Sequence, residues 1–488
     1  MAEKTGLIKR IHNMLKSKEA SCKEITQKYL DAVHKSKLNA YVTVCTEVAL
    51  ETADKVDKKI QNGEEISPLA GIPMTLKDVI STEGIETTCC SKILKGYVPV
   101  FNATVWELLK NQDAVLLGKS NMDEFAMGSS GRTSCIGPAK NPHDLDCMPG
   151  GSSSGAASAV GGNIAAYSLG SDTSGSIRQP AGLCGIVGVK PTYGAVSRYG
   201  VIPLASSLDQ VGPMAKTVED AALVFDAIAK HDPKDSTSRP HVHANAFKHL
   251  KDNIKGIKIG IPKAFFENLN FEVKKSVEDA IKAYESMGAQ VEHFDFPEVK
   301  YSLPVYYVLQ TAEASSNLSR FDGIRYGYKT ANYENIDDMI CKTRSEGFGQ
   351  EVKRRILLGN YVLSSGFYDA YYNKAQNLRN LIRNKFNKAF EQFDVLIAPT
   401  SPVTAPRLDC TYTSPEESYM ADVCVAPANI AGIPAISIPC GFDSKNLPIG
   451  MQLMGPKFSE SILLNTAHQF ELFTNFAHVR DLNMGVTL

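Results

Sequence analysis

Apolar residues recur along this chain with two different periods, one typical of helices and the other of strands. Residues 4–36 carry them at spacings of three and four, which predicts two amphipathic helices. Short apolar runs at 70–76 and 115–118 are bounded by turn residues and predict buried strands. The first part of the chain therefore mixes both kinds of element.

The same alternation continues toward the end of the chain. Residues 217–220 form an acidic variant of a capping box and predict a helix that runs through Ala229, while 231–240 is the clearest predicted loop. Gly288 suits the position just after a helix. The later predicted elements are strand 257–262, helix 272–287, strand 291–294, a helical region from about 360 to 393, and strand 395–398. Strands that alternate with helices indicate an α/β fold with a layered sheet.

Composition and charge restrict the possible functions. Hydrophobic residues make up 43% of the 488 residues and charged residues 22%, as in soluble globular proteins with a large core. The net charge of −1 gives no overall attraction for nucleic acid. No apolar segment approaches the roughly twenty residues that span a membrane, and the start lacks a secretory signal. The eleven scattered cysteines contain no C-x-x-C pair, so we expect no disulfide framework, no zinc site and a cytoplasmic location.

Glycine and serine crowd the segment from Met148 to Pro191, where charged residues are rare. Twelve of the 36 glycines fall between residues 150 and 200. A flexible linker can have such a composition, but here apolar residues alternate with the small ones. We therefore interpret the glycines as positions where the backbone turns tightly or approaches a ligand.

Several familiar glycine-rich sites do not fit this segment. The patterns of phosphate-binding and dinucleotide-binding loops are absent. Residues 151–155 match the G-x-S-x-G nucleophile elbow, but a loop precedes them where that motif needs a strand. His143 is the one histidine nearby and lies in a Pro-His-Asp turn, and the S-x-x-K motif occurs nowhere. A nucleophilic serine here would need a base other than histidine.

Lys77 is the candidate for that base. It follows the predicted strand 70–76, so its stem should enter the core. A lysine accepts a proton near neutral pH only if burial lowers its pKa by several units from about 10.4. The charge-poor segment 148–171 can provide such surroundings. A solvated Lys77–Asp78 pair on the surface is the alternative that these residues leave open.

Three motifs resemble the signature of the amidase-signature family. They are Gly71–Asp78, the Gly-Gly-Ser-Ser run at 150–153, and Asp172–Ala181. The match in residue type and spacing is close over roughly residues 65–215 and looser elsewhere. The resemblance implies a single large α/β domain whose central mixed sheet is covered by helices on both faces.

That domain would comprise residues 1–488. The resemblance divides it into an N-terminal helical segment up to about residue 62 and the signature core at about 65–215. The predicted loop at 231–240 would lie on its surface.

The resemblance also implies a catalytic triad of two serines and a lysine. Ser176 corresponds to the nucleophile, Ser152 to a bridging serine on a cis peptide bond, and Lys77 to the base. The oxyanion hole would consist of backbone N–H groups of Ser176 and of the loop before it, residues Thr173, Ser174 and Gly175.

Two positions depart from the family pattern, since Ser154 and Ser174 stand where glycine is more common. Ser174 can still donate its N–H if its φ angle is negative, because a Cβ atom disfavours positive φ. We therefore expect Ser174→Gly to keep activity, whereas a large loss would assign a role to the side chain.

Further segments resemble one branch of the family, the glutamine-hydrolysing subunits of tRNA-dependent amidotransferases. These segments are 313–327, 347–356 and 363–372. The resemblance implies L-glutamine as the substrate, hydrolysed through a γ-glutamyl ester. Its pocket residues would be Arg355 at the carboxylate, Asp422 at the α-amino group, Tyr306 or Tyr307 in the wall, and Ser129. From the residues alone, Arg354 and Arg355 could equally be a basic helix face.

The branch also implies partners, the B and C subunits of a heterotrimer. The released ammonia would pass to the B subunit, which holds the tRNA and uses ATP and Mg²⁺ to convert Glu-tRNA(Gln) to Gln-tRNA(Gln). The small C subunit would tighten the assembly. No cofactor or metal is expected in this chain, because its sequence contains none of the ATP-binding elements.

The sequence leaves two other functions open. One is a free-standing amidase that acts on another small amide, and the other is an inactive relative that serves as a scaffold. Glutamine turnover with and without partners separates the first from the amidotransferase component, and an acyl adduct on Ser176 excludes the second.

Overall fold

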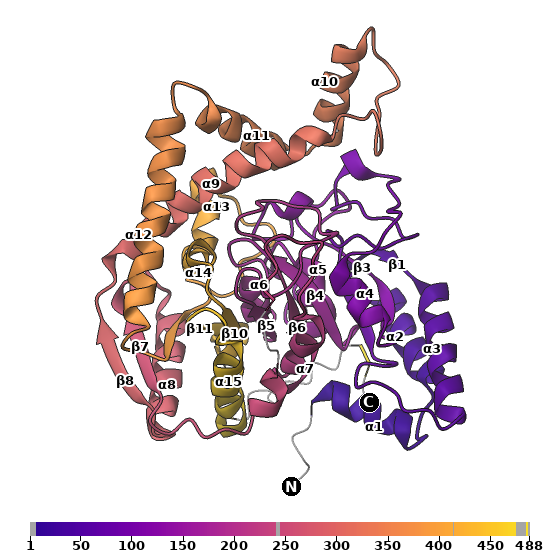
Figure 1. Ribbon diagram of the computed structural model, residues 1–488, viewed down its shortest axis with the longest axis vertical. Coiled ribbons are helices and arrows are strands. Elements are labelled where there is room, and N and C mark those ends of the chain that lie inside the picture. The colour runs from indigo at the N-terminus through magenta and orange to yellow at the C-terminus, as the bar shows by residue number, and fades with distance from the viewer. Residues whose placement is uncertain (1–5, 241–244, 413, 475–484, 487–488) are drawn as a thin grey trace.

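The structure is a computed structural model, and it describes residues 6–240, 245–412, 414–474 and 485–486. An eleven-stranded sheet crosses the molecule (Figure 1). In spatial order its strands are β1 (Tyr41–Val44), β3 (Val115–Ser120), β2 (Pro73–Lys77), β4 (Tyr167–Asp172), β6 (Gln210–Ala215), β5 (Val187–Lys190), β10 (Ala435–Phe442), β11 (Pro448–Met454), β9 (Val395–Pro399), β7 (Lys258–Pro262) and β8 (Gln290–Phe294). The pairs among β3, β2 and β4 and among β9, β7 and β8 are parallel, and the other pairs are antiparallel. The expected mixed sheet is therefore confirmed.

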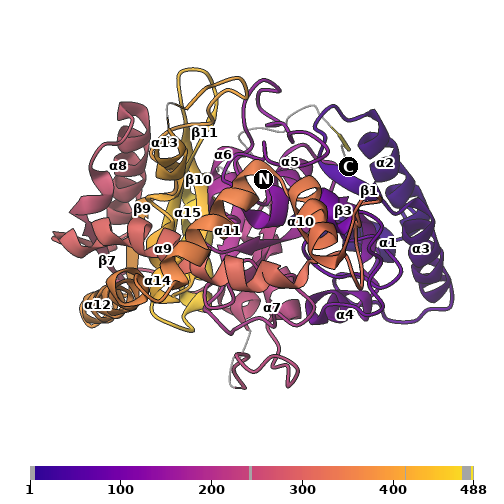
Figure 2. The ribbon, with the colours of Figure 1, turned by 90° about the horizontal axis from the view of Figure 1, so that it is seen from above.

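Helices flank this sheet, as the view from above shows (Figure 2). They are α1 (Leu7–Lys16), α2 (Cys22–Lys35), α3 (Thr46–Gln61), α4 (Thr104–Lys110), α5 (Ser154–Gly161), α6 (Arg178–Leu183), α7 (Val218–Ile228), α8 (Phe271–Ser286), α9 (Ser302–Asn317), α10 (Ile336–Gly347), α11 (Gln350–Leu363), α12 (Lys374–Ala389), α13 (Pro415–Tyr419), α14 (Ala426–Ala431) and α15 (Glu460–Thr474). In Figure 1, α10 and α11 lie at the top, above the body that contains the sheet. The α/β class predicted from the sequence is confirmed.

The helix caps explain two local predictions and correct a third. Gly288 has φ +89° just beyond α8, as the C-terminal position of a helix requires. Thr217 caps α7 by accepting the N–H of Asp220 at 3.1 Å. The Asp220 carboxylate does not complete a capping box, because it accepts the N–H groups of Leu7 at 2.9 Å and Ile8 at 3.0 Å. It caps α1, more than two hundred residues away.

The long helical region predicted from about 360 to 393 is confirmed for most of its length, but it is interrupted at 364–367 and ends at Ala389. Helix α11 ends at Leu363, and Ser364 is extended with ψ 149°. A turn and a π-helical segment (Asp369–Asn373) separate it from α12. Residues 364–366 are Ser-Ser-Gly, which favour helix ends, and the turn brings the Phe367 ring to 4.2 Å from the Tyr361 ring.

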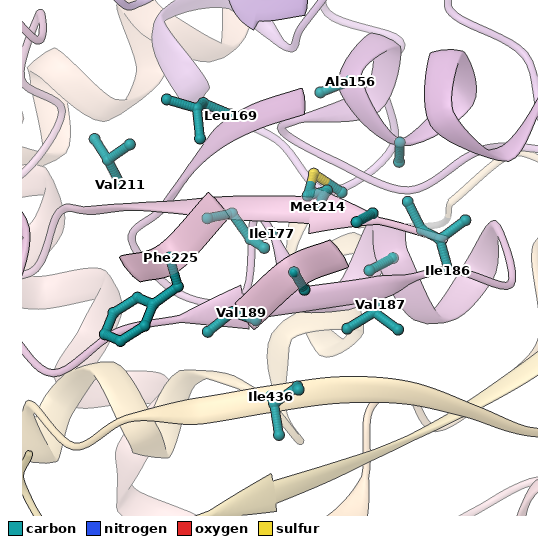
Figure 3. Packing of buried hydrophobic residues seen from close by; sticks show 14 of the residues in the cluster. Ala156, Leu169, Ile177, Ile186, Val187, Val189, Val211, Met214, Phe225 and Ile436 are labelled. Carbon is teal, nitrogen blue, oxygen red and sulfur yellow. The ribbon is translucent and has the colours of Figure 1, made fainter. Parts of the chain in front are cut away.

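The core behind the glycine-serine segment is tightly packed. Figure 3 shows Met214 of β6 near Ile177, whose side chain is buried, while Leu169 of β4 points away from Ile177. A Cβ atom on Gly170 would lie 2.8 Å from Ser153 Oγ and 3.0 Å from the Ile177 side chain. Glycine is thus required where β4 meets the segments that carry the serines, which confirms the interpretation of close backbone approach.

Candidate active site

Lys77 occupies the last position of β2 and is completely buried. Its Nζ forms hydrogen bonds with Ser152 Oγ at 2.7 Å and Ser171 Oγ at 3.0 Å. The neighbouring Asp78 turns away and lies 3.3 Å from Nζ of Lys119. The alternative of a solvated surface pair is therefore wrong, since strand alternation sends the two side chains to opposite faces.

Burial sets the protonation of Lys77. The loss of hydration lowers the pKa of its ammonium group to about 7, although the carboxylates of Asp123, Asp172 and Asp209 act in the opposite direction. In the described part of the chain, no carboxylate approaches Lys77 Nζ to ion-pair distance, and its hydrogen-bond partners are hydroxyls and one carbonyl. A large fraction of this amine is therefore neutral at physiological pH.

The two serines meet the lysine from different elements. Ser152 follows a cis Gly151–Ser152 peptide bond, as the family resemblance implied. The N–H of Ser153 donates to the carbonyl of Ser176 at 3.1 Å, so the segments that carry Ser152 and Ser176 are adjacent. Among the described residues no hydrogen bond joins the two hydroxyls themselves, and Ser176 is 4% exposed.

The loop before Ser176 is fixed by the carboxylate of Asp172. It accepts the N–H of Gly175 at 2.8 Å, the N–H of Ile177 at 3.2 Å and the Arg178 guanidinium at 3.1 Å. Burial alone would raise the pKa of Asp172, but Arg178 lowers it to about 2. Gly175 has φ +132°, and a Cβ atom there would lie 2.1 Å from a methyl group of Val425.

This arrangement changes the predicted oxyanion hole. The N–H of Gly175 is directed at Asp172 and is not free for a substrate oxygen, which corrects the sequence prediction for that residue. Thr173, Ser174 and Ser176 keep their place as candidate donors. The Thr173 hydroxyl donates to Asp209 at 2.7 Å, which holds the start of the loop in place.

Ser174 meets the condition set by its Cβ atom, because it is absent from the residues with positive φ in the described chain. Its hydroxyl donates to Asp422 Oδ2 at 3.3 Å. The side chain therefore links the loop before the nucleophile to the predicted ammonium-binding residue, a contact that the sequence did not indicate.

A cavity of about 510 Å³ is connected to this loop through Asp422, which contacts Ser174 and two residues of the cavity wall, although none of residues 172–176 lines it. Its wall includes Ser129, Tyr307, Glu351, Arg355 and Tyr419. The buried carboxylate of Asp422 lies behind the wall and accepts hydrogen bonds from Ser129 Oγ at 2.7 Å and Tyr307 OH at 3.2 Å. Burial raises the pKa of Asp422 to about 6, despite these hydrogen bonds and the nearby Arg355 charge. It is therefore an anion at neutral pH.

Arg355 projects from α11 into the same wall and is 3% exposed. Its Nε donates to Glu351 at 2.8 Å and its Nη1 to Gln310 at 3.1 Å. The rings of Tyr307 and Tyr419 lie 5.3 and 5.5 Å from its guanidinium carbon. The interpretation of Arg355 as part of a solvated basic face is wrong, because only the neighbouring Arg354 is exposed.

The two tyrosines of α9 have different positions. Tyr307 lines the cavity and contacts Asp422. Tyr306 is buried behind it, with its ring 4.9 Å away and edge-on, and the Ser174 side chain lies beside its hydroxyl. The structure thus places Tyr307 in the pocket wall and Tyr306 under the loop before Ser176.

Several residues at the site were missed in the sequence. Ser171 contacts Lys77, and Glu351 and Tyr419 surround Arg355. The i, i+4 spacing of Glu351 and Arg355 on a predicted helix was a usable signal. Tyr419 gave no such signal, because it reaches the site from a segment after β9.

The described residues contain no group of three or more His, Cys, Asp or Glu side chains that could hold a metal ion. None of their helices is long and apolar enough to cross a membrane. All eleven cysteines lie in described segments and none is in a disulfide.

The lysine, the paired serines and the fixed loop before Ser176 define an amide hydrolase. The sequence model of the amidase family matches residues 24–464. The chain belongs to the amidase family.

Individual relatives show which members of the family this chain resembles over nearly its whole length. The chain is 51% identical over 475 residues to the A subunit of the glutamyl-tRNA(Gln) amidotransferase of Carboxydothermus hydrogenoformans, covering 97% of this chain and 98% of that one. It is 52% identical to the corresponding protein of Caldanaerobacter subterraneus subsp. tengcongensis, with 95% of each chain covered.

Solved structures agree with these relatives. The crystal structure of the glutamyl-tRNA(Gln) amidotransferase A subunit from Thermotoga maritima has a TM-score of 0.75 at 39% identity, covering 91% of this chain and 90% of that one. The peptide amidase of Stenotrophomonas maltophilia has a TM-score of 0.84 at 28% identity, with 99% of both chains covered. This chain is therefore an amidase-family enzyme that shares its fold and about half of its sequence with amidotransferase A subunits.

Proposed function

We propose that this chain hydrolyses L-glutamine and supplies the ammonia to a tRNA-dependent amidotransferase. The observation that carries the proposal is the hydrogen bond of 2.7 Å between the buried amine of Lys77 and Ser152. A lysine whose pKa is near 7 can act as a base where no histidine is present.

The pocket wall supports an α-amino acid as the substrate. Such a molecule carries one carboxylate and one ammonium group. The wall contains the cations Arg132, Arg354 and Arg355 and the anion Glu351, and the Asp422 carboxylate lies behind it. Of these groups, the buried Arg355 would bind the carboxylate and Asp422 the ammonium group. Ser129 and Tyr307 hold the Asp422 carboxylate in position. Asp422 also contacts Ser174, so an ammonium group bound there would place the side-chain amide near the loop before Ser176.

The proposed reaction begins with proton transfer. Neutral Lys77 accepts the proton of Ser152, and Ser152 accepts the proton of Ser176 as its oxygen attacks the amide carbon. The Ser176 hydroxyl must move to within hydrogen-bond distance of Ser152, as groups of an unliganded site often do on substrate binding. N–H groups of Thr173, Ser174 and Ser176 would stabilise the oxyanion.

The tetrahedral intermediate then collapses. The C–N bond breaks, the proton held by Lys77 returns through Ser152 to the leaving nitrogen, and ammonia departs. Water attacks the γ-glutamyl ester on Ser176, loses a proton by the same route and releases glutamate, with the proton restored to the serine. The sum is glutamine and water giving glutamate and ammonia.

The names of the relatives support the wider role. In this proposal the ammonia passes to a partner that amidates Glu-tRNA(Gln), and that partner holds the tRNA, ATP and Mg²⁺. The B and C subunits would complete a cytoplasmic heterotrimer. Purification of the tagged chain from its source cells, with identification of the chains that accompany it, tests the assembly.

Trapping of the ester tests the chemistry. With glutamine and hydroxylamine, the full chain should form γ-glutamyl hydroxamate, and Ser176→Ala should form none. Propionamide, which lacks both charged groups, should be a poor substrate. Equal turnover of both amides would instead support a free-standing amidase, and failure to form hydroxamate from either amide, alone or with partners, would support an inactive scaffold.

A further inference from the structure

A second cavity lies apart from the one beside Arg355. Its volume is about 700 Å³, and the two linings share no residue. Four of its lining residues are cations: Arg239, Arg379, Arg383 and Lys457. None of its lining residues is acidic. This concentration of charge is unusual in a chain whose net charge is −1.

Three separate segments bring these cations together. Arg379 and Arg383 are four residues apart on α12, so both project from one face of that helix. Arg239 comes from the loop after α7, and Lys457 from the turn between β11 and α15. Tyr193 and Phe458 add aromatic rings to the wall.

No direct ion pair neutralises this positive charge in the part of the chain that the structure describes, although Glu313, which accepts hydrogen bonds from Ser207, attracts Arg379. In the described residues, none of the four cations has a carboxylate within 4.0 Å. By contrast Lys385, two residues beyond Arg383 on α12, pairs with Glu298 at 2.8 Å. The Arg383 Nε is buried and has no hydrogen-bond partner in the described structure.

One of the four cations, Arg379, is held by hydrogen bonds to the protein. Arg379 is 8% exposed and donates to the carbonyl and the hydroxyl of Ser207, both at 2.8 Å. Burial lowers the pKa of Lys457, and the charges of Arg383, Arg239 and Arg379 lower it further. The four groups thus repel one another, and an anion bound among them would reduce that repulsion.

We propose that this cavity binds a ligand with at least two phosphoryl groups. Arginine presents a planar fork of donors that matches the oxygens of a phosphoryl group. A terminal phosphate carries about −1.5 to −2 charges at neutral pH and a bridging phosphate one, so about two terminal or four bridging groups are needed to balance four cations. The ligand is a free polyphosphate or nucleotide, or the phosphodiester backbone of an RNA, and these share the same chemistry.

Calorimetric titration of the full chain with inorganic tripolyphosphate tests the proposal. We expect one ligand per chain. Arg383→Ala and Lys457→Ala should each weaken binding about tenfold or more, because each removes a charge-assisted hydrogen bond. Lys385→Ala is the matched control, since it removes one positive charge from the same helix outside the cavity and should leave the affinity unchanged.

Thermal melting of each variant shows whether it is folded, and Arg239→Ala, on an exposed loop, provides a third variant with little risk to folding. A second titration with a short RNA duplex separates the two sources. If RNA competes with tripolyphosphate and its binding is lost in the same variants, the ligand of the cavity is a phosphodiester backbone. If only tripolyphosphate binds, the ligand is a small phosphorylated molecule.

Three results would overturn the proposal. The first is no binding of either probe to the full chain. The second is equal weakening by Lys385→Ala and Arg383→Ala, which would indicate a diffuse charge effect. The third is tighter binding of a glutamate-rich peptide that displaces tripolyphosphate, which would assign the cavity to carboxylates.

Discussion

The region around Lys77 and the region around Arg355 each bury a basic side chain, but the surroundings of the two side chains differ. Lys77 is surrounded by hydroxyls and a carbonyl, and burial lowers its pKa to about 7. Arg355 has the Glu351 carboxylate at 2.8 Å and two tyrosine rings beside it. Burial without a counter-charge lowers the pKa of an amine until it is neutral, whereas a guanidinium stays charged and its burial requires partners that offset the lost hydration.

The difference assigns separate tasks to the two regions. A neutral amine can accept a proton, and a permanent planar cation can bind a carboxylate. The lysine region is formed by β2, β4 and the glycine-serine segment, which relatives with other substrates can share. The arginine region is formed by α9, α11 and the segment around Tyr419, where substrate choice is expected to vary.

The largest expected effect comes from removing the neutral amine. Lys77→Arg keeps the charge but cannot lose it, so glutamine hydrolysis should fall by about 10⁴-fold, the upper range for a general base. Ammonia release under saturating glutamine measures it. Lys110→Arg, at an exposed position, is the control. A Lys77→Arg enzyme within tenfold of the parent would contradict the comparison.

The next effect concerns the permanent cation. Arg355→Ala should raise KM for glutamine by about 10²-fold, the cost of charge-assisted hydrogen bonds, with a smaller change in kcat. Arg354→Ala, an exposed neighbour on the same helix, should leave KM nearly unchanged. Equal KM values for the parent and Arg355→Ala would refute the assignment of Arg355 to the substrate carboxylate.

The pH profile should separate the two regions. Lys77, with its pKa lowered to about 7, is neutral above that pH, so kcat should rise through pH 7. Asp422, with its pKa raised to about 6, must be ionised to bind an ammonium group, so kcat/KM should show a second loss below pH 6. Each ionisation changes the rate about tenfold per pH unit.

Asp422→Asn is the matched test of this profile. It should remove the lower ionisation from kcat/KM and leave the upper one in kcat. If the lower ionisation remains in the variant, Asp422 is not the group responsible.

Stability should respond in opposite directions in the two regions. The pKa of Lys77 is lower in the folded than in the unfolded state, so its charging disfavours the fold at low pH, and this cost disappears as pH rises from about 7 toward the unfolded value. Lys77→Met should therefore stabilise the protein by about 1–4 kcal/mol below pH 7.

Arg355→Met should instead destabilise the protein by about 3 kcal/mol, because the Glu351 carboxylate would keep only the exposed Arg354 and the Tyr419 hydroxyl as partners. Urea unfolding of both variants measures the difference. Destabilisation by both substitutions would contradict the claim that burial of Lys77, unlike that of Arg355, costs stability.

The smallest expected effect is at Ser174, which joins the two regions. Its hydroxyl donates to Asp422 at 3.3 Å, so Ser174→Gly should raise KM by a few-fold while kcat is retained. This refines the expectation from the sequence that activity is kept. A loss of kcat beyond tenfold would mean that the side chain orders the oxyanion loop itself.

The sequence predicted the lysine region better than the arginine region, and the reason is local. Gly71–Asp78 and Asp172–Ala181 are continuous motifs whose spacing and residue types carry the chemistry. The contact of Ser129 with Asp422 joins residues 293 positions apart, and no local pattern reports it. The hydrogen bond from the Gly175 N–H to Asp172 could not be predicted either, because it depends on side-chain geometry within the loop.

The secondary-structure predictions failed where tertiary contacts override the local sequence pattern. Apolar periodicity ran through residues 360–393, but Ser364 ends α11 and the Tyr361–Phe367 contact stabilises a turn. Asp220 looked like part of its own helix cap, and it caps α1 because the fold places that helix terminus beside it.

The proposed mechanism depends on the charge of one amine, and NMR can measure that charge directly. The ¹³Cε resonances of labelled lysines in the full chain, with Lys77 assigned by its absence in Lys77→Arg, follow protonation as pH is raised. A lysine that serves as the base should give a signal that titrates near pH 7. A signal that titrates above about pH 9, as an ordinary lysine does, would contradict the mechanism.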